Sequence, residues 1–159
     1  MAALQREVTF RFLAEPVDIN FGGKVHGGAV MKWIDQAAYA CAVGWSGKYC
    51  VTVYVGGIRF YRPVTIGSLV EVRARVILTG TTSMHIAVDV SAGDPREGSR
   101  ERTTHCIIIF VAIDETGRPV NVPPWNPETE NDRTLADYAR KLMELRSSIE
   151  QEMRAHADI

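Results

Sequence analysis

Residues 16–45, PVDINFGGKVHGGAVMKWIDQAAYACAVGW, decide the fold. Their first part is a glycine-rich loop, and the rest is rich in alanine and free of proline, which predicts a helix from about Gly28 to Val43. This helix is apolar nearly all round except for one narrow stripe at helical spacing, which consists of Lys32, Asp35, Gln36 and Tyr39. Helices with so little polar surface are buried in cores, so we expect it at the centre of the domain.

Stretches typical of β-strands lie on both sides of this helix. Apolar and polar residues alternate in residues 6–14, ahead of it. Four further runs of this kind follow it and are joined by short links with turn signals, at residues 50–60, 68–79, 83–91 and 102–113. One strand, one buried helix and four consecutive strands predict an α+β domain with an antiparallel sheet.

The tail of the chain predicts a second helix of a different kind. Asn126 is its expected N-cap and Pro127 its expected first residue, with acidic residues following. A narrow apolar stripe runs along this otherwise charged helix and comprises Leu135, Tyr138, Leu142, Leu145, Ile149 and Met153. We therefore divide the chain into a domain over residues 1–125 and a helix over residues 126–159 that packs on that domain or on a neighbouring subunit.

Composition narrows the class of protein. A chain of 159 residues, 46% hydrophobic and 23% charged, is one ordinary globular domain. Its formal net charge of -1 argues against nucleic acid as a partner, because phosphate binding needs a marked basic excess. Cys41, Cys50 and Cys106 are far apart and odd in number, which favours buried free thiols in a reducing compartment. Charges near the start and the absence of an apolar run of roughly 20 residues predict a cytoplasmic protein without a membrane partner.

Two features of residues 16–45 are candidates for chemistry. Glycine pairs at positions 22–23 and 27–28 precede a helix N-terminus, whose amides can donate hydrogen bonds to a carbonyl oxygen or an anion. The same glycines would equally suit tight packing. Asp35 is a carboxylate two turns into an apolar helix, where burial disfavours its charged form. An ion pair with Lys32 on a solvated stripe would explain Asp35 equally well.

The run NFGGKVHGGAVMKWID at residues 20–35 resembles the signature of the hotdog acyl-CoA thioesterases. It is similar to the bacterial YciA-like enzymes and to the brain-type cytosolic acyl-CoA hydrolases of animals. The similarity continues through residues 51–72, 79–90 and 107–124 and into PETE at residues 127–130, so it covers nearly the whole chain. It implies a hotdog fold, in which an antiparallel sheet wraps around a central helix, to which the C-terminal helix is an addition. It also implies hydrolysis of acyl-CoA to a free fatty acid and CoA, with no metal or organic cofactor.

The resemblance further implies how the site is assembled. Members of the family pair side by side into one continuous sheet, three such dimers commonly form a hexamer, and each active site lies across the dimer seam. By position, Asp35 corresponds to the helix carboxylate that acts as general base or nucleophile, and Asn20 to the loop asparagine of the opposite protomer. Gly27 and Gly28 correspond to the amides that polarise the thioester carbonyl. His26 is expected to line the substrate or the loop rather than to transfer protons.

Coenzyme A carries phosphates, so cations and hydroxyl groups should surround the site. Substrate-binding roles are expected for Arg59 and Arg62, and for Thr82 and Ser83 in a turn that matches a family region near the nucleotide. Further candidate cations are Lys24, Arg96, Arg100 and Arg102. An ordinary role as solvated surface residues remains open for all of them.

Two other functions on the same fold remain open. A hydratase or dehydratase acting on acyl thioesters would pair a loop histidine with a helix acid. Here the nearby histidine is His26, which directly precedes the helix glycines, and this spacing resembles the thioesterase pattern instead. A non-catalytic acyl-CoA-binding protein would need no base, but sensors of that type carry a DNA-binding module for which this chain has no spare length. Gly56 and Gly57 depart from the family pattern, since relatives are expected to carry side chains there, so the preferred acyl chain length is left undecided.

Overall fold

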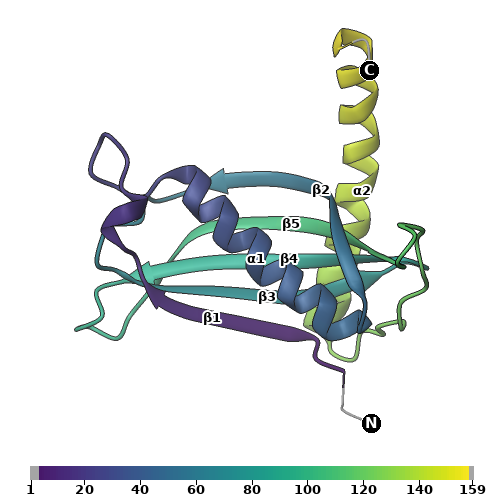
Figure 1. Ribbon diagram of the computed structural model, residues 1–159, viewed down its shortest axis with the longest axis horizontal. Helices are drawn as coiled ribbons and strands as arrows, with labels where there is room; N and C mark the ends of the chain where they lie inside the picture. Colours follow the sequence, from purple (N-terminus) through teal and green to yellow (C-terminus); the bar gives the residue numbers. More distant parts are fainter. Residues whose placement is uncertain (1–3, 158–159) are drawn as a thin grey trace.

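The computed structural model describes residues 4–157 of the chain. Its elements follow the expected order of one strand, one helix, four strands and a final helix (Figure 1). They are β1 (Glu7–Leu13), a short 3-10 helix η1 (Pro16–Asp18), α1 (Gly27–Ser46), β2 (Tyr49–Phe60), β3 (Leu69–Thr79), β4 (Ser83–Gly93), β5 (Glu101–Ile113) and α2 (Glu130–Ala157). The central helix is longer than predicted and ends only at Gly47, whose φ of 66° reverses the chain as a left-handed C-cap.

The five strands form one antiparallel sheet in the order β1-β3-β4-β5-β2, so β1 and β2 are its edges. The α1 helix packs on one face, which we call the inner face, against alternate strand residues such as Val72, Val88 and Ile108. The residues between them point to the other, outer face, where Ala87 and Ile107 pack against α2. The alternation of side chains along the strands thus separates a core under α1 from a smaller cluster under α2.

The exposed side of α1 borders strand β2. The ring of Tyr39 lies 6.2 Å from that of Tyr49 at the start of β2, and Asp35 accepts a hydrogen bond from Thr52. The alternative that Asp35 pairs with Lys32 is wrong, because no ion pair joins them among residues 4–157. The polar stripe of α1 therefore faces the open edge of the sheet rather than the solvent on all sides.

The α2 helix is attached to the outer face by small residues and by a polar chain. Ala136 and Ala139 are buried, which brings the helix backbone close to the sheet. The hydroxyl of Tyr138 lies 3.1 Å from Nε2 of His105 in β5, and Nδ1 of that histidine lies 2.8 Å from Asp89 in β4. These contacts fix the N-terminal half of α2 over the middle of the sheet.

The N-cap predicted for this helix is wrong. Asn126 and Pro127 both precede it, and Oγ1 of Thr129 accepts the capping hydrogen bond from the amide of Asp132 at 3.0 Å. The carboxylate of Asp132 in turn accepts a hydrogen bond from the amide of Thr129 at 3.2 Å. This reciprocal pattern is a capping box, and the Asp132 carboxylate also pairs with Arg6 at 2.9 Å, which holds the helix start in place.

The three cysteines are free and buried, as predicted. Burial raises the pKa of Cys41 and of Cys106 to about 12, so neither is a thiolate nucleophile at neutral pH. Among the described helices, none is long and apolar enough to cross a membrane.

His85 makes the stability of the fold depend on pH. Its side chain is 4% exposed on the outer face. Burial lowers the pKa of His85 to about 4 from the ordinary 6.5, and the positive charge of Arg146 acts in the same direction. The unfolded chain therefore binds more protons than the folded chain between these two pH values. The contribution of His85 to the free energy of unfolding is complete above pH 6.5 and is lost as the pH drops towards 4.

We expect the contribution of His85 to this loss to be about 3 kcal/mol per protomer. A His85→Phe variant keeps a ring at this position but cannot be protonated, so it should lose less stability than the wild type between pH 7 and pH 4. Urea unfolding at both pH values and at one fixed protein concentration measures the difference. Equal losses in the two proteins would show that the buried ring does not titrate in this range.

Candidate active site

The loop before α1 is organised by Asn20. Its side-chain Oδ1 accepts hydrogen bonds from the amides of Gly22 and Lys24 at 2.9 and 3.0 Å. Its backbone amide donates to the carbonyl of Lys24 at 2.6 Å, and Gly23 turns the chain between them with a φ of 80°. Because the oxygen holds the loop, the side-chain NH₂ is the group that Asn20 can offer to a ligand.

The helix that follows presents free backbone amides at its N-terminus. The amides of Ala29 and Val30 both donate to the carbonyl of His26, at 3.0 and 3.2 Å. The amides of Gly27 and Gly28 have no acceptor among the residues that the structure describes. A Cβ atom at Gly28 would meet nothing within 4 Å, so this glycine borders open space. His26 is the N-cap residue, but its imidazole makes no capping hydrogen bond.

Several predicted substrate-binding residues meet beside this helix end. Asn20, Gly27 and Arg62 line one surface hollow of about 310 Å³. Arg62 is exposed and pairs with Glu101 at 2.8 Å. Arg59 is close to Arg62 in the sequence, and its guanidinium lies 5.4 Å from the ring centre of Tyr61. The structure therefore brings the loop asparagine, Gly27 and two predicted cations, Arg62 and Lys24, together.

Asp35 lies elsewhere on the same chain. It is an exposed residue of α1, and its Oδ1 accepts a hydrogen bond of 2.8 Å from Oγ1 of Thr52 in β2. Seven residues separate it from Gly28, which corresponds to a rise of about 10 Å along the helix. One thioester carbonyl cannot contact both groups of the same chain at that distance.

Thr52 is a candidate site residue that the sequence did not reveal. A threonine in an apolar strand is an ordinary strand residue, and nothing in its neighbours marks it. Only the packing of α1 beside β2 shows that its hydroxyl points to a carboxylate.

Thr82 and Ser83 lie at the opposite end of the sheet from Gly27. Ser83 pairs with Val111, which pairs with Val51 near the start of β2. Gly27, in contrast, lies beside Phe60 at the end of β2, since a Cβ atom on this glycine would be 3.5 Å from the phenylalanine ring. Within one protomer the predicted site residues thus form two separate groups.

The remaining predicted cations differ in their surroundings. Lys24 lines the same hollow as Asn20. The others pair with acidic residues of their own chain: Arg96 with Asp94 at 2.7 Å, Arg100 with Glu71 at 2.8 Å and Arg102 with Asp89 at 2.8 Å. In the described part of the chain, no three His, Cys, Asp or Glu side chains lie close enough together to hold a metal ion.

Comparison with known proteins assigns this arrangement to a family. The model of the thioesterase superfamily matches residues 22–99, which include both glycine pairs and α1. The acyl-CoA thioester hydrolase YciA of Salmonella typhimurium is 37% identical over 123 residues, covering 75% of this chain and 92% of that protein. The chain belongs to the acyl-CoA thioesterase family. The expected hotdog fold and the expected class of enzyme, a thioester hydrolase, are confirmed.

Solved acyl-CoA thioesterases share the fold over nearly their whole length. A hexameric acyl-CoA thioesterase in its apo form has a TM-score of 0.86 at 31% identity, covering 95% of this chain and 94% of that one. The acyl-CoA hydrolase of Staphylococcus aureus, solved with butyryl-CoA, CoA and CoA disulfide, has a TM-score of 0.87 at 26% identity, covering 96% and 93%. Variants of the latter enzyme in which an asparagine, an aspartate or a threonine is replaced by alanine have also been solved.

Proposed function

We propose that this acyl-CoA thioesterase hydrolyses acyl-CoA to a fatty acid and CoA at sites shared by two protomers. One chain supplies Asp35 and Thr52, and its partner supplies Asn20, Gly27 and Gly28. The observation that carries the proposal is the hydrogen bond of 2.8 Å from Thr52 to Asp35, which fixes the carboxylate at the open edge of the sheet. The free amides of the same chain lie too far along α1 to act on the same carbonyl.

Strand β2 is suited to pair with a second copy of itself. It is an edge strand of the sheet, and its apolar residues Val53 and Val55 are exposed. Unpaired backbone groups combined with apolar side chains make such an edge a template for pairing. Antiparallel pairing about a two-fold axis would extend the two sheets into one.

The positions of the two half-sites set the register of that pairing. In an antiparallel pair, Thr52 of one strand lies opposite Phe60 of the partner when the two-fold axis passes near Gly56. Phe60 lies beside the helix N-terminus of its own chain, so the partner's free amides then face Asp35. The turn with Thr82 and Ser83 lies level with the start of β2. It is therefore at the same end of the joined sheet as the partner's free amides.

The Staphylococcus aureus enzyme supports this choice of residues. Its alanine variants replace an asparagine, an aspartate and a threonine whose spacing along the chain equals that of Asn20, Asp35 and Thr52 here. The chemical types and the intervals both agree, which a coincidence of unrelated surface residues would not produce. We therefore place these three residues in one site.

The chemistry follows from the groups in this shared site. Asp35, as the general base, takes a proton from a water molecule while the water oxygen forms a bond to the carbonyl carbon of the thioester. The amides of Gly27 and Gly28, at the positive end of the α1 dipole, donate hydrogen bonds to the oxyanion that develops. The C–S bond then breaks, and the CoA thiolate leaves and takes up the proton. The NH₂ of Asn20 holds the water or the carbonyl in position.

The surroundings of the site complete the proposal. Arg59 and Arg62 lie near the hollow and would bind the phosphates of CoA, together with Thr82 and Ser83 of the other protomer. We propose a hexamer of three such dimers, because a hexameric relative shares the fold at 31% identity. The three buried free thiols suit a reducing compartment, so we place the enzyme in the cytoplasm.

Release of thiol from acyl-CoA tests the proposed function. The purified protein is incubated with a series of acyl-CoA substrates from acetyl-CoA to palmitoyl-CoA, and a thiol reagent reports free CoA. We expect catalytic turnover with at least part of the series. A hydratase or dehydratase would instead change the absorbance of an enoyl-CoA without releasing thiol, and a binding protein would do neither.

Replacing Thr52 with valine tests its role as a positioning residue. The substitution removes the hydrogen bond to the Asp35 carboxylate, so kcat should fall about tenfold. The loss should fall on kcat while KM changes little, because the hydroxyl orients the base and does not bind the substrate. Thr52→Ser, which restores the hydroxyl, should recover kcat. A Thr52→Val enzyme with unchanged kcat would show that the hydroxyl has only a packing role.

A further inference from the structure

We infer that the C-terminal half of α2 docks on the partner protomer, so that two α2 helices lie antiparallel across the seam on the outer face of the joined sheet. This inference rests on the β2 pairing proposed above. It concerns the face opposite to α1, away from Asp35.

The contacts of α2 trace its path across the outer face. Asp132 pairs with Arg6, just ahead of β1, at 2.9 Å. Ala139 packs on β3, β4 and β5, and the guanidinium of Arg146 lies 4.9 Å from the ring centre of Tyr54 in β2. The rise from the first of these contacts to the last is about 21 Å, and four strand spacings are about 19 Å. The helix therefore crosses the strands nearly at right angles and reaches the β2 edge at Arg146.

The rest of the helix extends beyond the sheet of its own protomer. Figure 1 shows the yellow C-terminal part of α2 continuing past β2. From Arg146 to Ala157 the rise is about 16 Å, or about three strand spacings. Leu145, Ile149 and Met153 continue the stripe that packs on the sheet, but they are 53%, 52% and 57% exposed. These side chains point towards the plane of the sheet, in the region where a partner protomer joined at β2 would lie.

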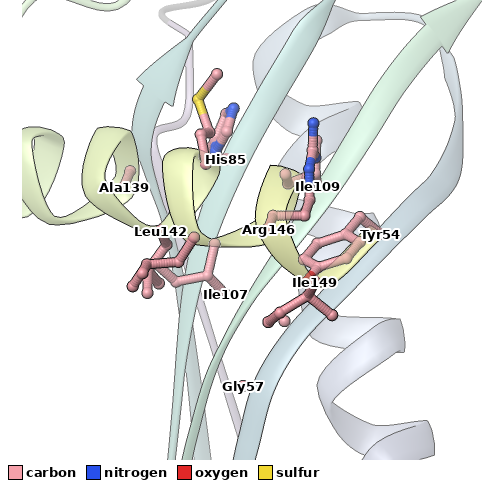
Figure 2. A pocket seen from close by; sticks show the side chains of 12 residues that line it. Tyr54, Gly57, His85, Ile107, Ile109, Ala139, Leu142, Arg146 and Ile149 are labelled. Carbon is pink, nitrogen blue, oxygen red and sulfur yellow. The ribbon is translucent and has the colours of Figure 1, made fainter. Parts of the chain in front are cut away.

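A cavity between α2 and β2 provides the receiving surface. It has a volume of about 130 Å³ and mostly apolar walls, which include Gly56 and Gly57 of β2, Ile107 of β5, and Leu142 and Ile149 of the same chain's α2 (Figure 2). The strand register shifts after Gly56, and Gly57 has a φ of 58°, so two successive strand positions have no side chain. Its size is close to that of the roughly 150 Å³ apolar cavity that holds benzene, which suits one aliphatic side chain.

The two-fold axis near Gly56 brings the partner's helix to this cavity. The α2 helix crosses β2 at Tyr54, two residues or about 7 Å to one side of the axis. By symmetry, the partner's α2 crosses on the other side, over Gly57 and Ile58. The two helices therefore clear each other, and Ile149 of the partner, about one strand spacing beyond its own β2, comes to lie over Gly57.

Cysteine crosslinking tests this placement without reference to activity. In the antiparallel pair, the two copies of Ser148 lie at the same level, whereas the two copies of Lys141 are about 20 Å apart along the helix axes. A bis-maleimide with a span of about 14 Å, the separation of two helices that each lie about 7 Å from the axis, should convert Ser148→Cys protein to a covalent dimer but not Lys141→Cys protein. The three native cysteines are buried and should not react. Crosslinking at neither position, or equally at both, would overturn the inference.

Charge substitution on the helix provides a second test. Ile149→Glu/Met153→Glu places two carboxylates on the docking stripe, and Ser147→Glu/Gln151→Glu places them on the opposite, exposed side. The first variant should raise the dissociation constant of the dimer at least tenfold, and the second should leave it unchanged, as measured by light scattering over a dilution series. Separation of hexamers into intact dimers would instead assign the stripe to contacts between dimers and would contradict the inference.

The crosslinking result also separates this inference from the proposed function. Crosslinking of Ser148→Cys protein that hydrolyses no acyl-CoA would support the helix pair and reject the function. Hydrolysis at shared sites without crosslinking would reject only the helix pair.

Discussion

Replacing Asp35 with asparagine should lower the turnover of acyl-CoA by roughly 10² to 10⁴, the range for the loss of a general base. Asparagine keeps the size of the side chain, and its carbonyl can still accept the hydrogen bond from Thr52. The folded oligomer should therefore persist. The neutral amide, however, cannot take a proton from water, so the loss should fall on kcat while KM changes little.

Steady-state thiol release by the purified variant measures this effect. Asp137→Asn is a matched control, because Asp137 is an exposed carboxylate on α2, on the face of the sheet away from the site. It should retain wild-type turnover. Turnover near the wild-type value in the Asp35→Asn protein would eliminate Asp35 as the base.

The fold could be predicted from the sequence because the patterns that specify its strands and helices are local. Alternation of apolar residues places each strand within two residues of its observed bounds. The alanine-rich run predicts a buried α1, since residues such as Ala37 and Ala38 can be enclosed completely. Only the helix ends were misplaced, because Asn126 and Thr129 are both good capping residues, and the choice between them depends on the partner that Asp132 finds in Arg6.

The candidate site could be predicted from the sequence only in part. Asn20, Gly27, Gly28 and Asp35 fall within one continuous motif, so the resemblance to a family assigns them together. Thr52 follows Asp35 by 17 residues and bonds to it only after β2 has folded against α1. The separation of the predicted residues into two groups at opposite ends of the sheet is likewise a property of the three-dimensional arrangement. This separation is the reason why we propose that a second chain completes the site.

Complementation between two inactive variants should restore activity if the site is shared. Asn20→Ala and Asp35→Ala proteins should each be nearly inactive alone, because every site in each dimer lacks one of the two residues. When subunits exchange, a mixed dimer has one site with both residues intact and one site with neither. Random exchange makes about half of the dimers mixed, with one working site each, so about a quarter of wild-type activity should return.

The most direct measurement is therefore the thiol-release rate of an equimolar mixture of these two variants, taken before and after subunit exchange. Exchange is confirmed independently by mass spectrometry of differently tagged chains. Sites shared across the seam predict a rise from nearly zero to about a quarter of the wild-type rate. No recovery despite confirmed exchange would mean that Asn20 and Asp35 act within one chain, or that Asn20 only holds its loop, and would contradict the shared site.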